Sequence, residues 1–250
     1  MTLARSNETI AREFWNATGL PQTFPRDIEK AVALKLPLAL VKLPRVTVPV
    51  VRRWLDERRL RARVPHDRRE LMGCLVAYRG LGIAFICGAD PTDEQRLTVA
   101  HETAHFLHDY LLPRQEVLQT LGDGMADVLD GKRVPTPSER ANAVLAHVRL
   151  GPHVHLFPRM GGAEDSDPRV AAAEDRADGL GLELVAPRER IISFVRGASE
   201  AGGAADELAA GLAVRFGLPS QVFERFIQPP RQQRIVSFLE DIRPALETGR

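Results

Sequence analysis

The segment from Leu97 to Leu107 carries two histidines and a glutamate, His101, Glu102 and His105, within an apolar pattern that has helical spacing. Residues four apart lie on one face of a helix, one turn above each other, so both imidazoles can reach a single ion. Apolar residues at positions 97, 100, 104, 106, 107 and 111 cover a wide part of this helix, which must therefore be largely buried. The chain has to build a packed structure around it.

Glu102 follows the first histidine by one residue, which turns its carboxylate about 100° around the helix from that histidine. From there it can act on water at a metal ion without being a ligand itself. The pattern predicts a zinc site that hydrolyses an amide bond, with His101 and His105 as ligands and Glu102 as general base. The alternative interpretation is that both histidines are ordinary core residues of a packed helix.

Helix signals mark both ends of this motif helix. The segment from Asp90 to Asp93 supplies a capping residue, a proline and an early acid at its start. Pro113 lacks a backbone donor, and the helix is expected to end there.

The two cysteines flank a predicted hairpin that precedes the motif helix. Its strands are expected to turn at Gly80-Leu81, which would place Cys74 opposite Cys87. A disulfide is then sterically conceivable, but two buried thiols are the favoured state in a reducing compartment.

The composition sets the outer limits for the whole chain. With 250 residues it can bury a sizeable core, and its formal charge of +1 indicates no general affinity for polyanions. The first residues lack the apolar core of a signal peptide, and the most apolar stretch, Ala31 to Leu43, is too short to span a bilayer. These features predict a cytoplasmic protein without membrane contact.

A zinc hydrolase of this kind needs a third protein ligand while one position stays open for water. A helix expected from Asp167 to Pro187 contains Glu174 and Asp178, which are four residues apart and share a face. This arrangement suits Glu174 as ligand and Asp178 as hydrogen-bond partner of a ligating imidazole. The spacing fits a solvated helix face, paired with nearby arginines, equally well.

Two stretches of the chain form a pair of motifs: Arg-Leu-Thr-Val-Ala-His-Glu-Thr-Ala-His at 96–105 and Glu-Asp-Arg-Ala-Asp-Gly-Leu-Gly-Leu-Glu-Leu-Val-Ala-Pro at 174–187. Taken together they resemble the ImmA/IrrE family of bacterial metallopeptidases. The family pairs an R-x-T-x-A-H-E-x-x-H helix with a later E-x-x-A-[DN]-x-x-A-x-E-L-L-x-P helix. The likeness covers roughly residues 45 to 190. It implies one zinc ion on His101, His105 and Glu174, with Glu102 as base.

The resemblance also implies a biological setting. Family members typically act in the cytoplasm on helix-turn-helix transcriptional repressors, which they cleave to release stress-response or mobile-element genes. The expected partner of this chain is accordingly a protein substrate, a repressor.

This chain departs from the family pattern in three places. The second histidine is followed by Phe-Leu-His-Asp at 106–109, where Leu-Leu-Leu-His is commoner. Gly179 and Gly181 stand inside the second motif, where a helix-interior glycine costs about 1 kcal/mol relative to alanine. They are expected to allow close approach to the motif helix. The stretch between the two motifs is also long, which predicts an insertion from about 113 to 162.

The expected fold class is α+β and mainly helical. A small antiparallel sheet or hairpin packs on the motif helix in a zincin-like arrangement. The expected regions are a helical N-terminal part at 1–66, a zincin-like core at 67–190 that contains the insertion, and a helical C-terminal part at 191–250.

Two further histidines, His153 and His155, alternate in the segment from Gly151 to Pro158. In an extended segment both point to the same side. Zinc peptidases need a donor for the oxyanion of the tetrahedral intermediate, and either histidine can serve. The alternative is a hydrogen-bonded loop histidine without a catalytic part.

Two segments are candidates for contact with nucleic acid. Residues 42–70 hold ten basic against four acidic side chains, although a solvated face is the favoured interpretation. Residues 208–226 have the pattern of a helix-turn-helix with Gly217 in the turn, but few side chains suit base reading, and packing on the catalytic unit is favoured. The alternative to the endopeptidase is a zinc-dependent, non-proteolytic protein that binds DNA or a repressor.

Overall fold

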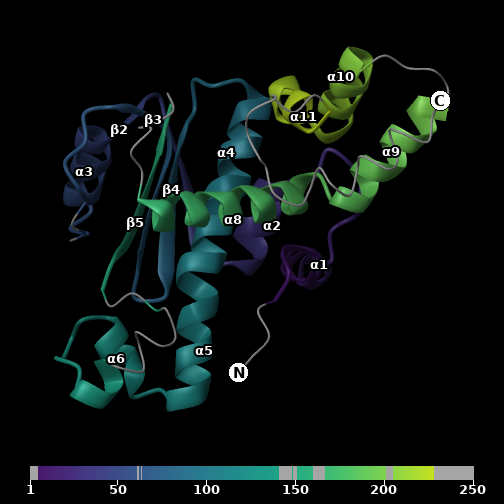
Figure 1. The fold of residues 1–250 in the computed structure, drawn as a ribbon. Coiled ribbons are helices and arrows are strands. Elements are labelled where there is room, and N and C mark those ends of the chain that lie inside the picture. Colours follow the sequence, from purple (N-terminus) through teal and green to yellow (C-terminus); the bar gives the residue numbers. More distant parts are fainter. Residues whose placement is uncertain are drawn as a thin grey trace.

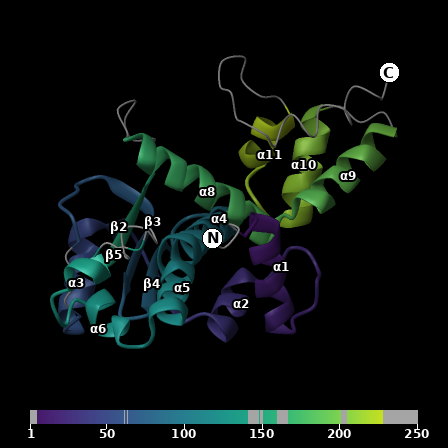
Figure 2. The same cartoon turned by 60° about the horizontal axis from the view of Figure 1, so that its bottom comes forward.

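The structure is a computed structural model that describes residues 5–60, 62, 64–140, 148, 151–159, 167–200 and 205–227. A five-stranded sheet lies between helices on both of its faces (Figures 1 and 2). The larger core fills the space between the sheet and the helices that carry the motifs, and a smaller core lies on the opposite face. The α+β, mainly helical fold class is confirmed.

The N-terminal region begins with two capped helices, α1 (Asn7–Thr18) and α2 (Ile28–Lys35). The side chains of Ser6 and Asp27 accept hydrogen bonds from backbone amides in the first turns of α1 and α2. A third helix, α3 (Val48–Glu57), is capped in the same way by Thr47 and covers the smaller core.

The region at 1–66 contains the expected helices, but the prediction missed two strands that lie between α2 and α3. These strands are β1 (Leu38–Leu43) and β2 (Val46–Thr47). β1 is held by parallel pairing with β4, more than forty residues further along the chain, and β2 by pairing with β3. Pairing over such a separation leaves no local sequence signal.

The hairpin of β3 (Glu70–Tyr78) and β4 (Leu81–Cys87) turns one residue earlier than expected. Arg79 and Gly80 form the turn, with φ of 54° and 78°. A two-residue hairpin turn of type I′ requires a positive φ at both of these positions. In this register Cys74 lies opposite Phe85, so the predicted register, which set Cys74 opposite Cys87, was wrong. Both are buried free thiols.

The sheet is mixed, not antiparallel as expected. β1 runs parallel to β4, whereas β5 (His153–Pro158) runs antiparallel to β3 on the other side of the sheet. β5 belongs to the segment predicted as an insertion, so at least this part of it is integral to the fold. The strand order places β5 at one edge of the sheet and β1 at the other.

The motif helix α4 (Thr92–His105) is buried on all sides from Thr98 to its end. It does not stop at Pro113. The chain continues through a π-helical segment, Phe106–Leu111, into α5 (Leu112–Leu121), where Pro113 occupies the first turn and needs no intrahelical donor. At the other end Pro91 precedes the first helical residue, and Asp90 makes no capping hydrogen bond to the helix.

The second motif forms α8 (Pro168–Val185), which crosses α4 (Figure 1). A Cβ atom at Gly181 would lie 3.3 Å from backbone atoms of Ala100 and His101, which confirms the expected close approach at this glycine. Gly179 faces a different neighbour, because a Cβ atom there would lie 2.7 Å from Nδ2 of Asn7 on α1.

Short helices complete the described structure. They are α6 (Met125–Leu129), α9 (Arg188–Glu200), α10 (Ala205–Phe216) and α11 (Ser220–Ile227). Phe216 and Phe223, from α10 and α11, are buried in the larger core, and the carbonyl of Gly217 accepts a hydrogen bond from Arg96 on α4. This contact supports packing on the motif helix as the role of the predicted helix-turn-helix. Within the described residues no helix is long and apolar enough to cross a membrane.

Candidate metal centre

Two glycines in the sheet let α4 approach it closely enough to bury the motif residues. A Cβ atom at Gly73 would lie 2.6 Å from Oε1 of Glu102, and one at Gly82 would lie 2.6 Å from the ring of Phe106. The side chain of Glu102 is 0% exposed as a result. Its carboxylate is therefore enclosed between the helix and the sheet.

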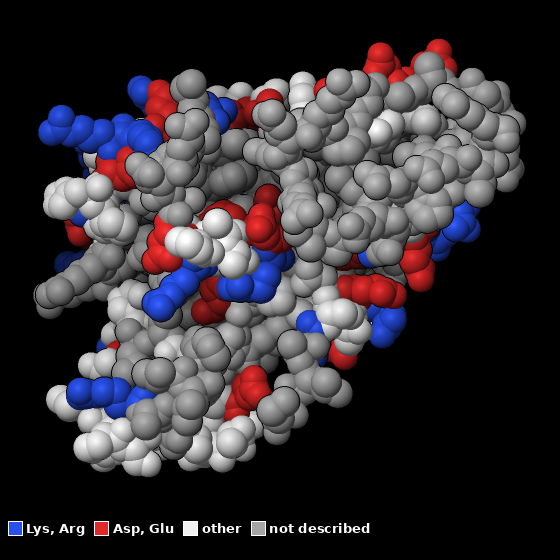
Figure 3. Space-filling view, in the orientation of Figure 1, with Lys and Arg blue, Asp and Glu red and all other residues white. Residues whose placement is uncertain are grey.

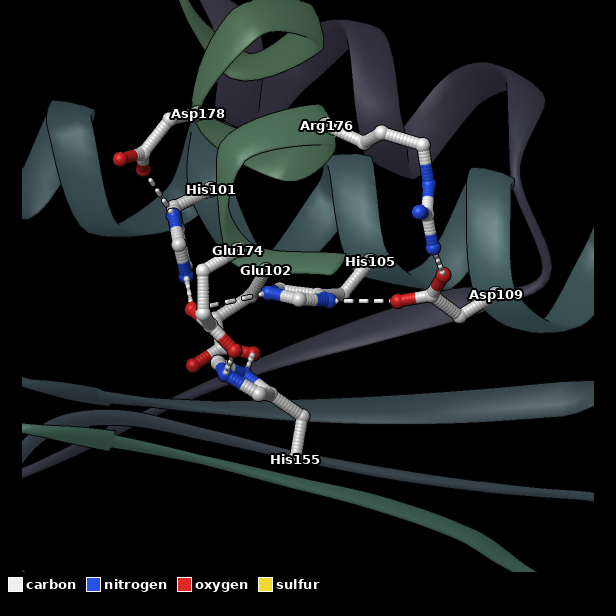
Figure 4. A network of polar contacts seen from close by, with 8 residues as sticks. All are labelled: His101, Glu102, His105, Asp109, His155, Glu174, Arg176 and Asp178. Carbon is white, nitrogen blue, oxygen red and sulfur yellow. Dashed lines mark hydrogen bonds and ion pairs between the residues drawn. The ribbon is translucent and has the colours of Figure 1, made fainter. Parts of the chain in front are cut away.

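Four side chains from three elements converge beside Glu102 (Figure 4). The Nε2 atoms of His101 and His105 each lie 3.4 Å from Oε2 of Glu174, which projects from α8. Nε2 of His155, on β5, lies 3.1 Å from the other oxygen of Glu174. The four candidate ligand atoms all lie within 4.8 Å of one another, so this cluster can hold a metal ion.

The three imidazoles of the cluster have matching surroundings. Each turns its Nε2 toward Glu174 and donates a hydrogen bond from Nδ1 to a different carboxylate. These pairs are His101 with Asp178 at 2.9 Å, His105 with Asp109 at 2.6 Å, and His155 with Glu102 at 2.9 Å. A carboxylate on the far nitrogen orients an imidazole and makes it a stronger metal ligand.

The charges of the cluster depend on one another. Burial favours the neutral form of His101, but the nearby carboxylates of Asp178 and Glu174 raise its pKa to about 9. Burial opposes the charge of His155 in the same way, and the carboxylates of Glu102 and Glu174 raise its pKa to about 10. Burial also opposes the charge of Glu174, yet the three histidines beside it hold its pKa far below the usual range.

Unpaired polar atoms indicate that a cation fits this place. Nε2 of His101, Nε2 of His105 and Oε1 of Glu102 are buried and have no hydrogen-bond partner among the described residues. Each such atom costs about 1–3 kcal/mol when it stays unpaired. With neutral imidazoles, the carboxylates of Glu102 and Glu174 carry a charge that a divalent cation would balance. Nitrogen and carboxylate donors suit zinc and also accept manganese or iron.

Aromatic contacts from β5 cover the ligand imidazoles. Phe157 stacks on His101 with ring centroids 4.0 Å apart, and His155 stacks on His105 at 3.7 Å. Glu174 is the most exposed of the four candidate ligands, with 35% of its side chain accessible. The cluster therefore meets solvent along α8, where acidic and basic side chains gather near the middle of the face in Figure 3.

Glu174 and Asp178 occupy the places that their spacing on α8 predicts. Of the two alternating histidines only His155 reaches the cluster, where it is a candidate ligand, a role that the sequence did not suggest. His153 is buried beside the ring of Tyr110, with centroids 6.4 Å apart. Asp109 was also missed, although it follows His105 by the same four-residue spacing that links Glu174 to Asp178.

Many basic side chains of residues 42–70 have partners within the chain, which supports the solvated-face interpretation. Basic side chains at the upper left of Figure 3 lie on the side of α3 and β2. The pairs are Lys42 with Glu29, Arg45 with Glu70, Arg69 with Asp67, and Arg58 stacked on Trp54. Contact with nucleic acid stays a prediction.

Comparisons with known proteins do not show which family this chain belongs to. A scan against protein-family models found no match, and neither did searches of curated proteins and of solved structures. The likeness to the ImmA/IrrE family thus depends on the two sequence motifs alone.

Proposed function

We propose that this protein is a cytoplasmic zinc endopeptidase that hydrolyses a peptide bond in a protein substrate, a helix-turn-helix repressor. One observation carries the proposal. The Nε2 atoms of His101 and His105 converge on Glu174 while Glu102, the base of the motif, is buried beside them. The repressor as substrate comes from the resemblance to the ImmA/IrrE family.

Zinc bound by His101, His105 and Glu174 would polarise the scissile carbonyl and lower the pKa of water. Glu102 supplies the proton transfers. Its Oε1 is an unpaired acceptor among the described residues, so it can take a proton from the attacking water and return that proton to the leaving amine. Hydrolysis on this scheme needs no covalent intermediate with the protein.

His155 is the better placed of the two candidate oxyanion donors. Its ring lies against that of His105, and its Nε2 faces the cluster. A hydrogen bond from this nitrogen would stabilise the negative charge that develops on the carbonyl oxygen. His153, turned toward Tyr110, is not among the residues of the cluster.

Metal content and cleavage should be measured together on a small set of variants. The wild type is expected to hold about one zinc ion per chain and to cut a repressor encoded by a neighbouring gene at a single site. Glu102→Gln should keep the zinc and lose about 10²–10⁴-fold in cleavage rate, because only the proton transfer is removed. Glu174→Ala should bind zinc more weakly and hold less of it, because one ligand is removed.

The matched control is Glu116→Gln, an exposed position on α5, which should behave as the wild type. Elemental analysis reports the metal, and gel electrophoresis with mass spectrometry reports the cut. Cleavage that survives Glu102→Gln would refute the assigned base. Full zinc content in Glu174→Ala would refute the ligand set.

A further inference from the structure

His155 differs from an ordinary oxyanion donor in one respect: it has the surroundings of a metal ligand. Like the two motif histidines, it turns Nε2 toward Glu174 and donates from Nδ1 to a carboxylate. Its Nε2 lies nearer to Glu174, at 3.1 Å, than either motif nitrogen, at 3.4 Å. It faces Oε1 of Glu174, whereas the two motif nitrogens face Oε2, so all three imidazoles surround the same carboxylate.

The partner of His155 is the base of the motif itself. Oε2 of Glu102 accepts the hydrogen bond from Nδ1 at 2.9 Å. In this arrangement Glu102 does for His155 what Asp178 and Asp109 do for the motif histidines, since it orients the ring. One of the two carboxylate oxygens of Glu102 is therefore engaged in a hydrogen bond with His155.

We propose that His155 is a releasable fourth metal ligand, which would close the centre at rest. A tetrahedral zinc site with four protein ligands has no position left for water, whereas a catalytic site keeps one open. Release of His155 would open that position, free Oε2 of Glu102, and leave the imidazole at hand as oxyanion donor. The inference deepens the proposed peptidase function and depends on it for the last of these steps.

The fold favours release by rotation of the side chain over detachment of the strand. β5 pairs with β3 along its whole length, from His153 to Pro158, with one irregularity in the register. Beyond its last residue, Arg159 forms an ion pair with Asp90 at 2.7 Å, at the start of the motif helix. The backbone is thus tied at both ends, while the ring of His155 is held by its stacking on His105 and by its hydrogen bonds.

Cobalt substitution tests the proposal without any substrate. The visible absorption spectrum of bound Co²⁺ reports the number and kind of its ligands, and azide shifts that spectrum where a position is open. We expect the wild type to give a four-coordinate spectrum that azide leaves unchanged. In His155→Ala the spectrum should change and respond to azide, and Co²⁺ affinity should fall at least about tenfold.

Two further variants keep the test decisive. His155→Gln also lacks the imidazole, but glutamine fills similar space. Its Co²⁺ spectrum and Co²⁺ affinity should match those of His155→Ala, even if the smaller alanine side chain loosens the fold. His66→Ala removes a histidine from an exposed site outside the cluster and should match the wild type. The proposal is overturned if azide alters the wild-type spectrum as it does that of His155→Gln, or if both proteins bind Co²⁺ equally well.

The outcomes also separate this inference from the proposed function. If repressor cleavage depends on Glu102 but the wild-type centre is open to azide, the peptidase stands and the closed resting form falls. If the centre is closed and no cleavage depends on Glu102, the fourth ligand stands and the peptidase falls.

Discussion

Gly73 offers the sharpest test of how the sheet positions the base. In Gly73→Ala the new Cβ atom would lie 2.6 Å from Oε1 of Glu102 and 2.7 Å from Cγ2 of Thr98. Both neighbours are fully buried, and the β-branched threonine is restricted in a helix, so neither can turn away freely. Overpacking of this kind costs about 1–3 kcal/mol, and alanine regains about 0.5–1 kcal/mol in a strand.

With mid-range values for both terms, the expected net loss in the free energy of unfolding is about 1 kcal/mol, or about 2–4 °C in Tm for a chain of this size. Urea denaturation followed by circular dichroism, with EDTA present, measures it without a contribution from metal binding. Because Glu102 must shift, peptide hydrolysis should fall further than the folded fraction does.

Gly197→Ala is the matched control for this variant. Gly197 lies within α9, and no atom would come within 4 Å of an added Cβ atom. It should stabilise the protein by about 0.5–1 kcal/mol. If Gly73→Ala proves as stable as the wild type while Gly197→Ala behaves as expected, the argument that Gly73 sets the distance between sheet and helix is wrong.

Two other predictions concern the metal centre and its protons. Asp109→Asn should weaken zinc binding by about 10–100-fold, measured by competition with a chelating dye. Asp178→Asn should weaken zinc binding less, because the Asp178 side chain is 71% exposed and that of Asp109 only 16%. Equal losses of zinc affinity in the two variants would contradict this reasoning. In the metal-free protein the pKa is raised to about 9 for His101 and to about 10 for His155, so protonation of these imidazoles stabilises the folded state. This contribution is complete below pH 6.5 and is lost as pH rises through 9 to 10. Urea unfolding in EDTA from pH 6 to pH 10 should show this decline, and a constant stability over that range would refute it.

The sequence alone located the centre of the site because the relevant spacing is local. Residues four apart on a helix share a face whatever surrounds them, so His101, His105, Glu174 and Asp178 could be assigned to two helix faces in advance. Capping residues such as Ser6 and Thr47 marked helix starts for the same reason.

The tertiary structure decided what completes the site. His155 reaches the cluster through the pairing of β5 with β3, and no local pattern sets that register, since a shift by one residue would turn the imidazole to the other face of the sheet. No local pattern predicts the strands β1 and β2 either, and both lie within a region that was predicted to be helical. Gly73 matters only because α4 lies against it. Contacts between segments far apart in the chain depend on how the whole core packs, and a single sequence does not reveal that packing.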